Sequence, residues 1–85
     1  MLYRIVTERK NVEATETIID KYFDCYTTIE AKGKWHGTSE PSIIFEIIAG
    51  IQHYPTMKQI AREIDEVNGQ EAVLVQSLQC NSVLV

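Results

Sequence analysis

This sequence of 85 residues is sparing in glycine, proline, cysteine and aromatic residues. It has 4 glycines, 2 prolines and 2 cysteines, and 8% of its residues are aromatic. Hydrophobic residues make up 45% and charged residues 24%, a balance typical of a globular chain. A disordered segment would hold less isoleucine and valine, so this composition excludes intrinsic disorder. The length allows one domain, which we predict to span residues 1–85.

Long apolar runs and an excess of basic charge are also lacking. No segment approaches the ~20 apolar residues that cross a bilayer, and no basic region followed by an apolar stretch marks a signal peptide. Twelve acidic and eight basic residues give a net charge of −4. A domain that binds phosphates usually carries a basic stripe, so we expect neither a nucleic acid nor a membrane as partner.

The two cysteines, Cys25 and Cys80, lack the CxxC spacing of metal-binding and redox motifs. Because no secretory signal is visible, we expect reduced thiols in a cytoplasmic protein. A zinc or copper site would need the fold to bring these cysteines together with His36 and His53. We therefore predict neither a metal nor a cofactor.

The first half of the chain alternates between strand and helix patterns. Residues 2–7 predict a strand, and Asn11 is expected to cap an amphipathic helix of about three turns. Residues 25–32 alternate again and predict a second strand. Residues 33–41 contain two glycines and a proline, so they predict a long hairpin loop.

The second half repeats this order. Residues 42–49 are apolar on both faces except at Glu46, which indicates a central strand. After a loop over residues 50–55, Thr56 and Gln59 have the form of a capping box for a second helix. Asn68-Gly69 is typical of a helix end, and residues 71–79 predict the last strand. The apolar stripe of this helix consists of Met57, Ile60, Ala61, Ile64 and Val67.

The order strand, helix, strand, strand, helix, strand predicts an α+β fold of the ferredoxin-like βαββαβ type. Right-handed crossovers place the first and third strands at the centre of a four-stranded antiparallel sheet, with two helices on one face. The helix side is predicted to carry Tyr3, Ile5, Ile29, Ala31, Ile43, Phe45, Ile47 and Ala49. The free side is predicted to carry Leu2, Arg4, Val6, Tyr26, Thr28, Glu30, Ile44, Glu46, Ile48 and Gln76.

The centre of this free side is too apolar to face water comfortably. We therefore predict a homo-oligomer, a dimer or a trimer, and the alternative is a monomer with a mixed surface. The tail Val83-Leu84-Val85 is expected to add to the sheet edge of a neighbour. Arg4 and Glu46 are expected to pair across strands. The predicted interface consists of Leu2, Arg4, Val6, Ile44, Glu46 and Ile48.

Candidate chemistry gathers in the predicted hairpin, which holds Trp35, His36 and Glu40. The histidine and the carboxylate could bind a ligand or move a proton, and the indole could stack on a ring. The simpler interpretation is a solvated hairpin anchored by Trp35. His53 lies just before the second helix, whose N-terminus could hold a small anionic ligand. No nucleophile with an adjacent base, P-loop or dinucleotide motif is present, so we predict that the protein is not an enzyme.

The segment Lys34-Trp35-His36-Gly37, followed by Glu40 and the apolar residues 43–48, resembles the hairpin of the CutA divalent-ion tolerance family. Proteins of that family, like the nitrogen-regulatory signal-transduction proteins, have a ferredoxin-like fold and form trimers through their sheets. The resemblance covers about residues 33–48 and the order of the elements. The chain is shorter than the family and lacks its aromatic and acidic C-terminal segment, so the resemblance implies trimer assembly and no metal chemistry. In its compact size the chain also resembles small phage or prokaryotic proteins.

Two functional hypotheses follow. The first is a non-enzymatic homo-oligomeric module that binds a small ligand or a nucleotide near the Trp35 hairpin, with Trp35, His36, Glu40 and His53 as ligand-binding residues. The alternative is a protein-interaction or inhibitor module, such as a small phage effector, that uses the free sheet face or edge.

Overall fold

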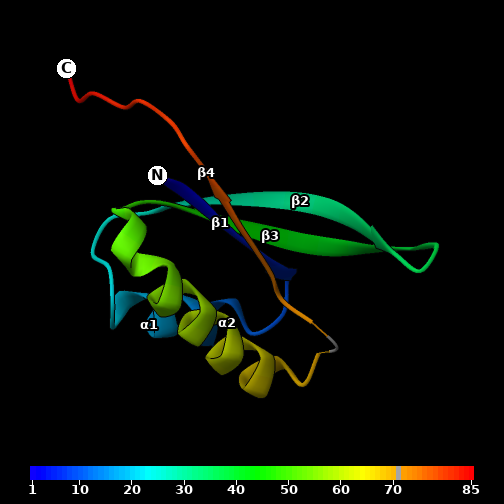
Figure 1. The fold of residues 1–85 in the computed structure, drawn as a ribbon. Helices are drawn as coiled ribbons and strands as arrows, with labels where there is room; N and C mark the ends of the chain where they lie inside the picture. Colours follow the sequence, from blue (N-terminus) through cyan, green and yellow to red (C-terminus); the bar gives the residue numbers. More distant parts are fainter. Residues whose placement is uncertain (71) are drawn as a thin grey trace.

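The computed structural model describes residues 1–70 and 72–85. The elements are, in order, β1 (Leu2–Glu8), α1 (Val12–Asp20), β2 (Thr27–Trp35), β3 (Thr38–Ile48), η1 (Ile51–His53), α2 (Tyr54–Asn68) and β4 (Leu74–Leu78). The strands form one antiparallel sheet in the order β2-β3-β1-β4, and both helices cover the same face of it (Figure 1). This is the predicted ferredoxin-like arrangement, with β1 and β3 at the centre.

The core lies between the sheet and the helices. In β1, Tyr3, Ile5 and Thr7 are buried while the residues between them are partly exposed, as expected of a strand with one covered face. The Tyr3 hydroxyl donates to the Gly50 carbonyl at 2.8 Å, so the buried phenol is satisfied. The largest core residues besides Tyr3 are Ile5, Ile19, Phe45, Ile47, Met57, Ile60 and Ile64.

The prediction of a long hairpin loop over residues 33–41 was wrong. β2 continues to Trp35, β3 begins at Thr38, and only His36 and Gly37 form the turn, with φ of 49° and 81°. Pro41 is tolerated inside β3 because its carbonyl, which accepts from Arg9, faces the end of β1, so the missing N–H breaks no ladder hydrogen bond. Correspondingly, β2 begins at Thr27 rather than Cys25.

The two predicted helix caps have different outcomes. Asn11 lies at the N-cap position of α1 as predicted, but it has φ of 51° and its side chain makes no capping hydrogen bond. Its side-chain amide donates to Asn68 Oδ1 at 3.2 Å instead. α2 begins at Tyr54, with Pro55 in its first turn, so Thr56 and Gln59 lie inside the helix and form no capping box. The predicted helix end at Asn68-Gly69 is confirmed, with φ of 60° at Gly69.

Side chains near these ends also differ from the predicted pattern. Val67 is exposed, and the neighbouring Asn68 is buried in its place because it joins a polar network described below. β4 begins at Leu74, and Glu71, the first residue of the predicted last strand, lies outside the described residues.

The predicted faces of β2 are inverted. Ile29 pairs with Ile44 and Ala31 with Ser42, so both lie on the free side of the sheet. The aromatic ring of Tyr26 packs edge-to-face on Phe45 at 6.1 Å, which fixes the alternation of the strand. Thr28 and Glu30 consequently lie on the helix side, with Tyr26. The free-side placement of Leu2, Arg4, Val6, Ile44, Glu46, Ile48 and Gln76 agrees with the register of β1, β3 and β4.

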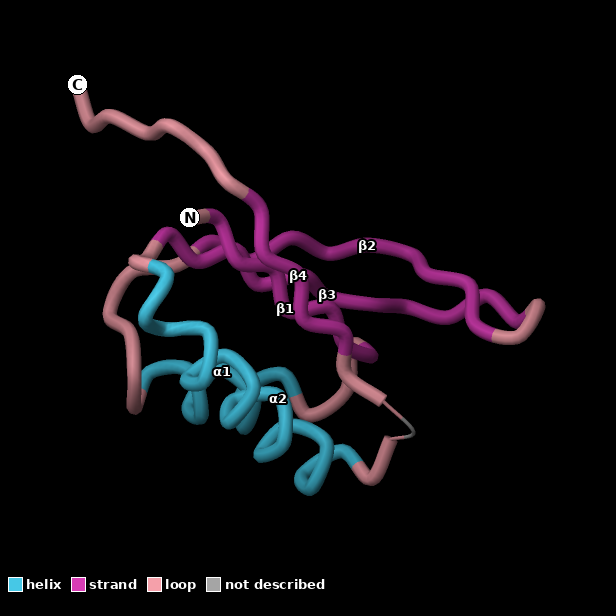
Figure 2. Tube along the Cα trace, viewed as in Figure 1, coloured by secondary structure: helices cyan, strands magenta, loops and turns pink. Residues whose placement is uncertain are grey.

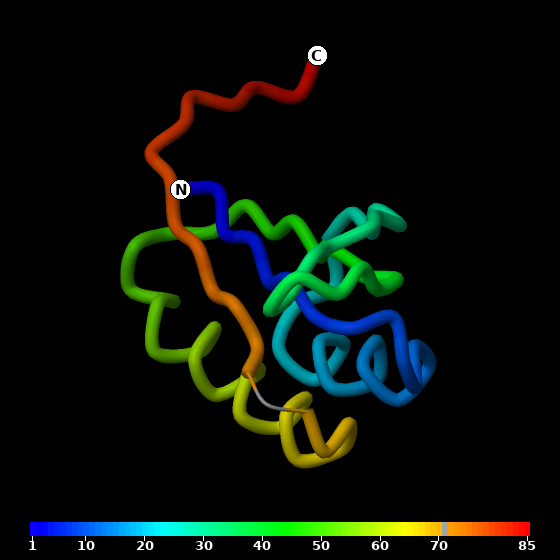
Figure 3. Tube along the Cα trace, turned by 90° about the vertical axis from the view of Figure 1, so that its right-hand side faces the viewer, coloured from blue at the N-terminus to red at the C-terminus, as the bar shows by residue number. Residues whose placement is uncertain are grey.

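The molecule is elongated, with principal extents of 38 × 24 × 20 Å. The β2–β3 hairpin projects at one end of the sheet (Figure 2). After β4 the chain runs away from the sheet at the other end, past the N-terminus (Figures 1 and 3). The free side of the sheet therefore lies between these two projections.

Candidate ligand pocket and free sheet face

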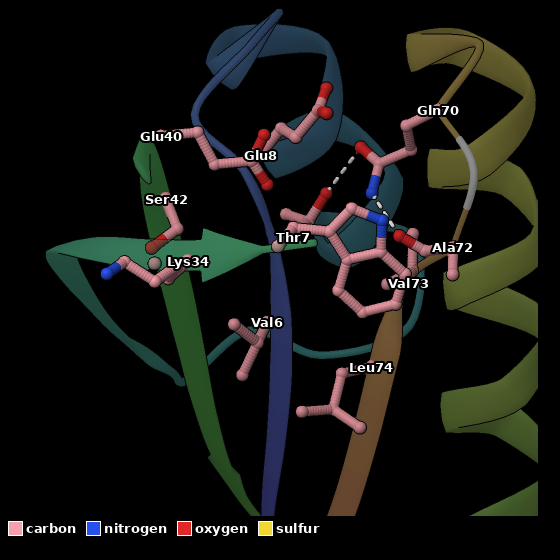
Figure 4. A pocket seen from close by; sticks show the side chains of 12 residues that line it. Val6, Thr7, Glu8, Lys34, Glu40, Ser42, Gln70, Ala72, Val73 and Leu74 are labelled. Carbon is pink, nitrogen blue, oxygen red and sulfur yellow. Dashed lines mark hydrogen bonds between the residues drawn. The ribbon is translucent and has the colours of Figure 1, made fainter. Parts of the chain in front are cut away.

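A pocket of about 440 Å³ lies at the end of β1, where this strand meets the base of the hairpin and the connection from α2 to β4. Its volume is within the range of small-molecule sites. Figure 4 shows Val6 and Leu74 at one end of the pocket and Glu8 and Glu40 at the other. The remaining wall is formed by Thr7, Gly33, Lys34, Trp35, Ser42, Gln70, Ala72 and Val73.

A network of hydrogen bonds holds one wall of the pocket in place. The buried Thr7 hydroxyl donates to Gln70 Oε1 at 2.7 Å, and Asn68 Nδ2 donates to the same oxygen at 2.8 Å (Figure 4 shows the first of these). Gln70 Nε2 donates to the Ala72 carbonyl at 2.6 Å. The Lys10 ammonium donates to the Asn68 carbonyl at 2.6 Å. These bonds join the end of β1 to the end of α2 and to the segment between α2 and β4.

The hairpin turn places Trp35 at the pocket. Two successive residues with positive φ, His36 and Gly37, give the tight turn that the twist of a two-stranded hairpin favours. The rings of Trp35 and His36 meet edge-to-face at 4.9 Å. Trp35 remains 49% exposed, so its indole is accessible at the rim of the pocket.

Two carboxylates lie on the free side at the acidic end of the pocket. Glu8 pairs with Ser42 across β1 and β3, and Glu40 lies two residues before Ser42 on the same face of β3. Within the described part of the chain neither carboxylate forms an ion pair, whereas Glu30, Glu46 and Glu63 each have a cationic partner. The pocket therefore combines an apolar end with an end that carries two carboxylates, and Lys34 also lines the pocket without an ion pair to either of them among the described residues.

The free face beside the pocket is largely apolar. Ile48 is 57% exposed there. The strand register also places Ile29, Leu74 and Leu78 on this face, and these three were not among the predicted interface residues. The predicted pair of Arg4 and Glu46 is confirmed: the Arg4 Nε donates to Glu46 Oε2 at 2.8 Å. The two charges at the centre of the sheet therefore neutralise each other, and the side chains around them are apolar.

The structure brings together only part of the predicted ligand set. Trp35 and Glu40 line the pocket, and His36 lies beside them in the turn. His53 is at the other end of β3, which spans ~33 Å, and packs on Phe23 at 5.3 Å. Cys25 and Cys80 are exposed thiols. Across residues 1–70 and 72–85, no three His, Cys, Asp or Glu residues group in a way that could hold a metal ion.

A second, open hollow of about 1120 Å³ lies at the opposite end of the sheet. It is bounded by the free-side residues Glu46 and Ile48, by the start of β2, and by Ser82–Leu84 of the C-terminal segment. On its wall the Tyr26 hydroxyl donates to Asp20 Oδ1 at 2.7 Å. Burial, followed by this hydrogen bond, raises the pKa of Tyr26 to about 12.

Sequence reasoning missed Glu8, Ser42 and Gln70 as pocket residues. Glu8 was excluded from the predicted strand by one residue, and Ser42 was taken only as the start of another. The signal that could have found them is the strand register, because extending β1 to Glu8 sets its carboxylate opposite Ser42. Gln70 carried no such signal, since it follows the helix in an irregular segment.

Comparison with known proteins gives the fold and nothing more specific. The chain matches no model of a known protein family and no curated protein. Among solved structures it is similar to the de novo designed protein Foldit4, with a TM-score of 0.55 and 14% identity over 94% of each chain. The order of the elements and of the strands thus defines a ferredoxin-like domain. None of the helices in the described regions has the length and apolarity required to cross a membrane.

Proposed function

We propose that the protein is a non-enzymatic homo-oligomeric module that binds a small ligand in the pocket beside Trp35. The observation that carries this proposal is the apolar free face. A sheet face with Ile29, Ile48 and Leu78 exposed is a surface of the kind that monomers rarely leave in water.

The size of this face agrees with an interface between copies. Four strands spaced ~4.8 Å apart and about seven residues long cover roughly 20 × 25 Å, or about 500 Å² per copy. Two such faces bury about 1,000 Å², which is the lower limit for a specific interface. A face-to-face dimer and a trimer of the kind that CutA proteins form are the two assemblies we propose.

The pocket lies at the margin of the proposed interface. Val6 and Leu74 belong to the free face and also form the apolar end of the pocket. A second copy on the free face would therefore narrow the opening of the pocket and shield its contents from water. Because the free face and the pocket share these residues, we expect ligand binding and assembly to affect each other.

The mass in solution tests the assembly. Light scattering behind a sizing column is expected to give two or three times the chain mass of 9.7 kDa. Ile48→Glu places a charge on the free face and is expected to yield single chains. Ile51→Glu is the matched control, because Ile51 is 71% exposed but lies in η1, outside the sheet. Single chains for the unmodified protein at high concentration would contradict the assembly.

A second candidate function, binding of another protein, is favoured by the outer edge of β4. Residues Leu74–Leu78 carry no charge, whereas the other edge strand, β2, carries Lys32 and Lys34, which discourage strand pairing. The apolar Val83–Val85 segment that follows is exposed. If the chain proves to be a monomer, strand addition at β4 becomes the better proposal, and replacing Gln76 and Ser77 by proline is expected to abolish it.

A further inference from the structure

The pocket at the end of β1 contains two like charges on neighbouring strands. Glu8 and Glu40 both lie on the free side, and no cation pairs with either among the residues that the structure describes. Lys34 also lines the pocket but forms no ion pair with them. Like charges at such positions repel each other, so a positive group between them would be stabilised.

A third polar group faces the same space. Ser42 is only 6% exposed, lines the pocket, and its hydroxyl has no hydrogen-bond partner within residues 1–70 and 72–85. The adjacent Gly33 leaves room beside it, since a Cβ at that position would lie 3.5 Å from Ser42 Oγ. A hydroxyl that lines a pocket and has no partner within the protein can accept a hydrogen bond from a donor on a ligand.

The rest of the pocket is suited to an apolar body. The Trp35 indole, Val6 and Leu74 form its apolar surface, with Ala72 and Val73 beside them (Figure 4 shows the last four). Tryptophan is also the side chain whose ring best attracts a cation. An aromatic or aliphatic group can therefore pack here while an attached cation reaches the carboxylates.

We propose that this pocket binds an organic cation, an ammonium or guanidinium group carried on a compact apolar body, and this rests on the proposed ligand-binding function. The cation lies between the Glu8 and Glu40 carboxylates and donates to Ser42 Oγ. A hard metal ion fits less well, because two carboxylates and one hydroxyl fall short of the six or more oxygens that calcium takes.

The test compares three ligands that share one body: 2-phenylethylamine, 2-phenylethanol and phenylacetate. Trp35 is the sole tryptophan, so its fluorescence, excited at a wavelength where these compounds do not absorb, reports binding directly. We expect the amine to bind at least about tenfold more tightly than the alcohol, and the acid more weakly than either. Added salt is expected to weaken the binding of the amine alone.

Glu8→Gln and Glu40→Gln are each expected to reduce the affinity for the amine, and the double variant is expected to reduce it to the affinity for the alcohol. Glu66→Gln is the matched control, because Glu66 is an exposed carboxylate of α2 and is not among the residues that line the pocket. Thermal melting verifies that each variant is folded. Equal affinity for the amine and the alcohol, or an unchanged amine preference in both pocket variants, would overturn the proposal.

The outcomes also separate this inference from the proposed function. If phenylacetate or a nucleotide perturbs Trp35 and the amine does not, the cation inference fails while ligand binding stands. If none of the three compounds, nor a nucleotide, changes the fluorescence or the melting temperature, the ligand-binding function fails with it.

Discussion

At the scale of single residues, Tyr26 links three parts of the fold. It precedes β2, its ring packs on Phe45 of β3, and its hydroxyl donates to Asp20 at the end of α1. Burial removes water from the phenol, and the neutral hydroxyl donates a hydrogen bond to the Asp20 carboxylate, so ionisation of Tyr26 is disfavoured in the folded state. The pKa of Tyr26 is therefore about 12, against 10.0 for an ordinary tyrosine.

This difference predicts a loss of stability at high pH. The folded protein keeps the Tyr26 proton up to about pH 12, while the unfolded chain releases it near pH 10, so unfolding is increasingly favoured between these values. Below pH 10 the contribution is fully present. We expect Tyr26→Phe to remove this part of the pH dependence, as measured by urea unfolding at pH 8 and pH 11.

Tyr54→Phe serves as the control, since Tyr54 is exposed and its hydroxyl has no hydrogen bond among the described residues. An equal fall in unfolding free energy for the Tyr26→Phe and unmodified proteins would contradict the role given to Tyr26.

Only some of the residues that line the pocket could be predicted from local sequence patterns. Trp35 and Glu40 were found because an aromatic ring and a carboxylate stand out in a short polar segment. Glu8 and Ser42 look ordinary in the sequence, and they become important only because pairing of β1 with β3 sets them opposite each other. Information of this kind depends on long-range register, which local patterns do not contain.

At the scale of elements, the hairpin turn depends on Gly37. Its φ of 81° is a conformation that costs other residues ~1–2 kcal/mol, and among the described residues, its two chain neighbours aside, no atom lies within 4 Å of where a Cβ would be. We expect Gly37→Ala to lower the free energy of unfolding by about 1 kcal/mol through backbone strain alone. Chemical unfolding monitored by circular dichroism measures this.

Gly33→Ala in the same hairpin provides the comparison. Gly33 does not have positive φ, and its new Cβ would make ordinary contact with Ser42, so this change is expected to leave stability equal or slightly higher. A destabilisation by Gly33→Ala as large as that by Gly37→Ala would refute the explanation from positive φ.

The same elements explain which parts of the fold the sequence predicts. Period and order were sufficient for all four strands and both helices, because apolar spacing reflects burial directly. The bounds of the strands and helices were harder to predict. Pro41 indicates a loop by itself, yet it lies within β3 because β1 has already ended beside it. Asn11 does lie at the N-cap position of α1, yet its side chain makes no capping bond, and its amide donates to Asn68, which is 57 residues away.

At the scale of the whole molecule, stability depends on how much apolar surface the fold buries. A domain of this size buries only about 60–65% of its unfolded surface, so a single chain is marginally stable. Here the helices cover one face of the sheet and leave the other face apolar and exposed. Burying that face in a second copy would add stability that depends on protein concentration.

The melting temperature should therefore rise with concentration. For a dimer, a tenfold increase adds ~1.4 kcal/mol per dimer, or about 0.7 kcal/mol per chain, which corresponds to about 4 °C for a domain of this size. Ile48→Glu is expected to lower the melting temperature and to make it independent of concentration, because the charged side chain cannot be buried against a copy of itself. Ile51→Glu is expected to keep the concentration dependence. A melting temperature that stays constant over a hundredfold range in the unmodified protein would show that the apolar face is tolerated in water, and the stability would then have to come from the core of a single chain.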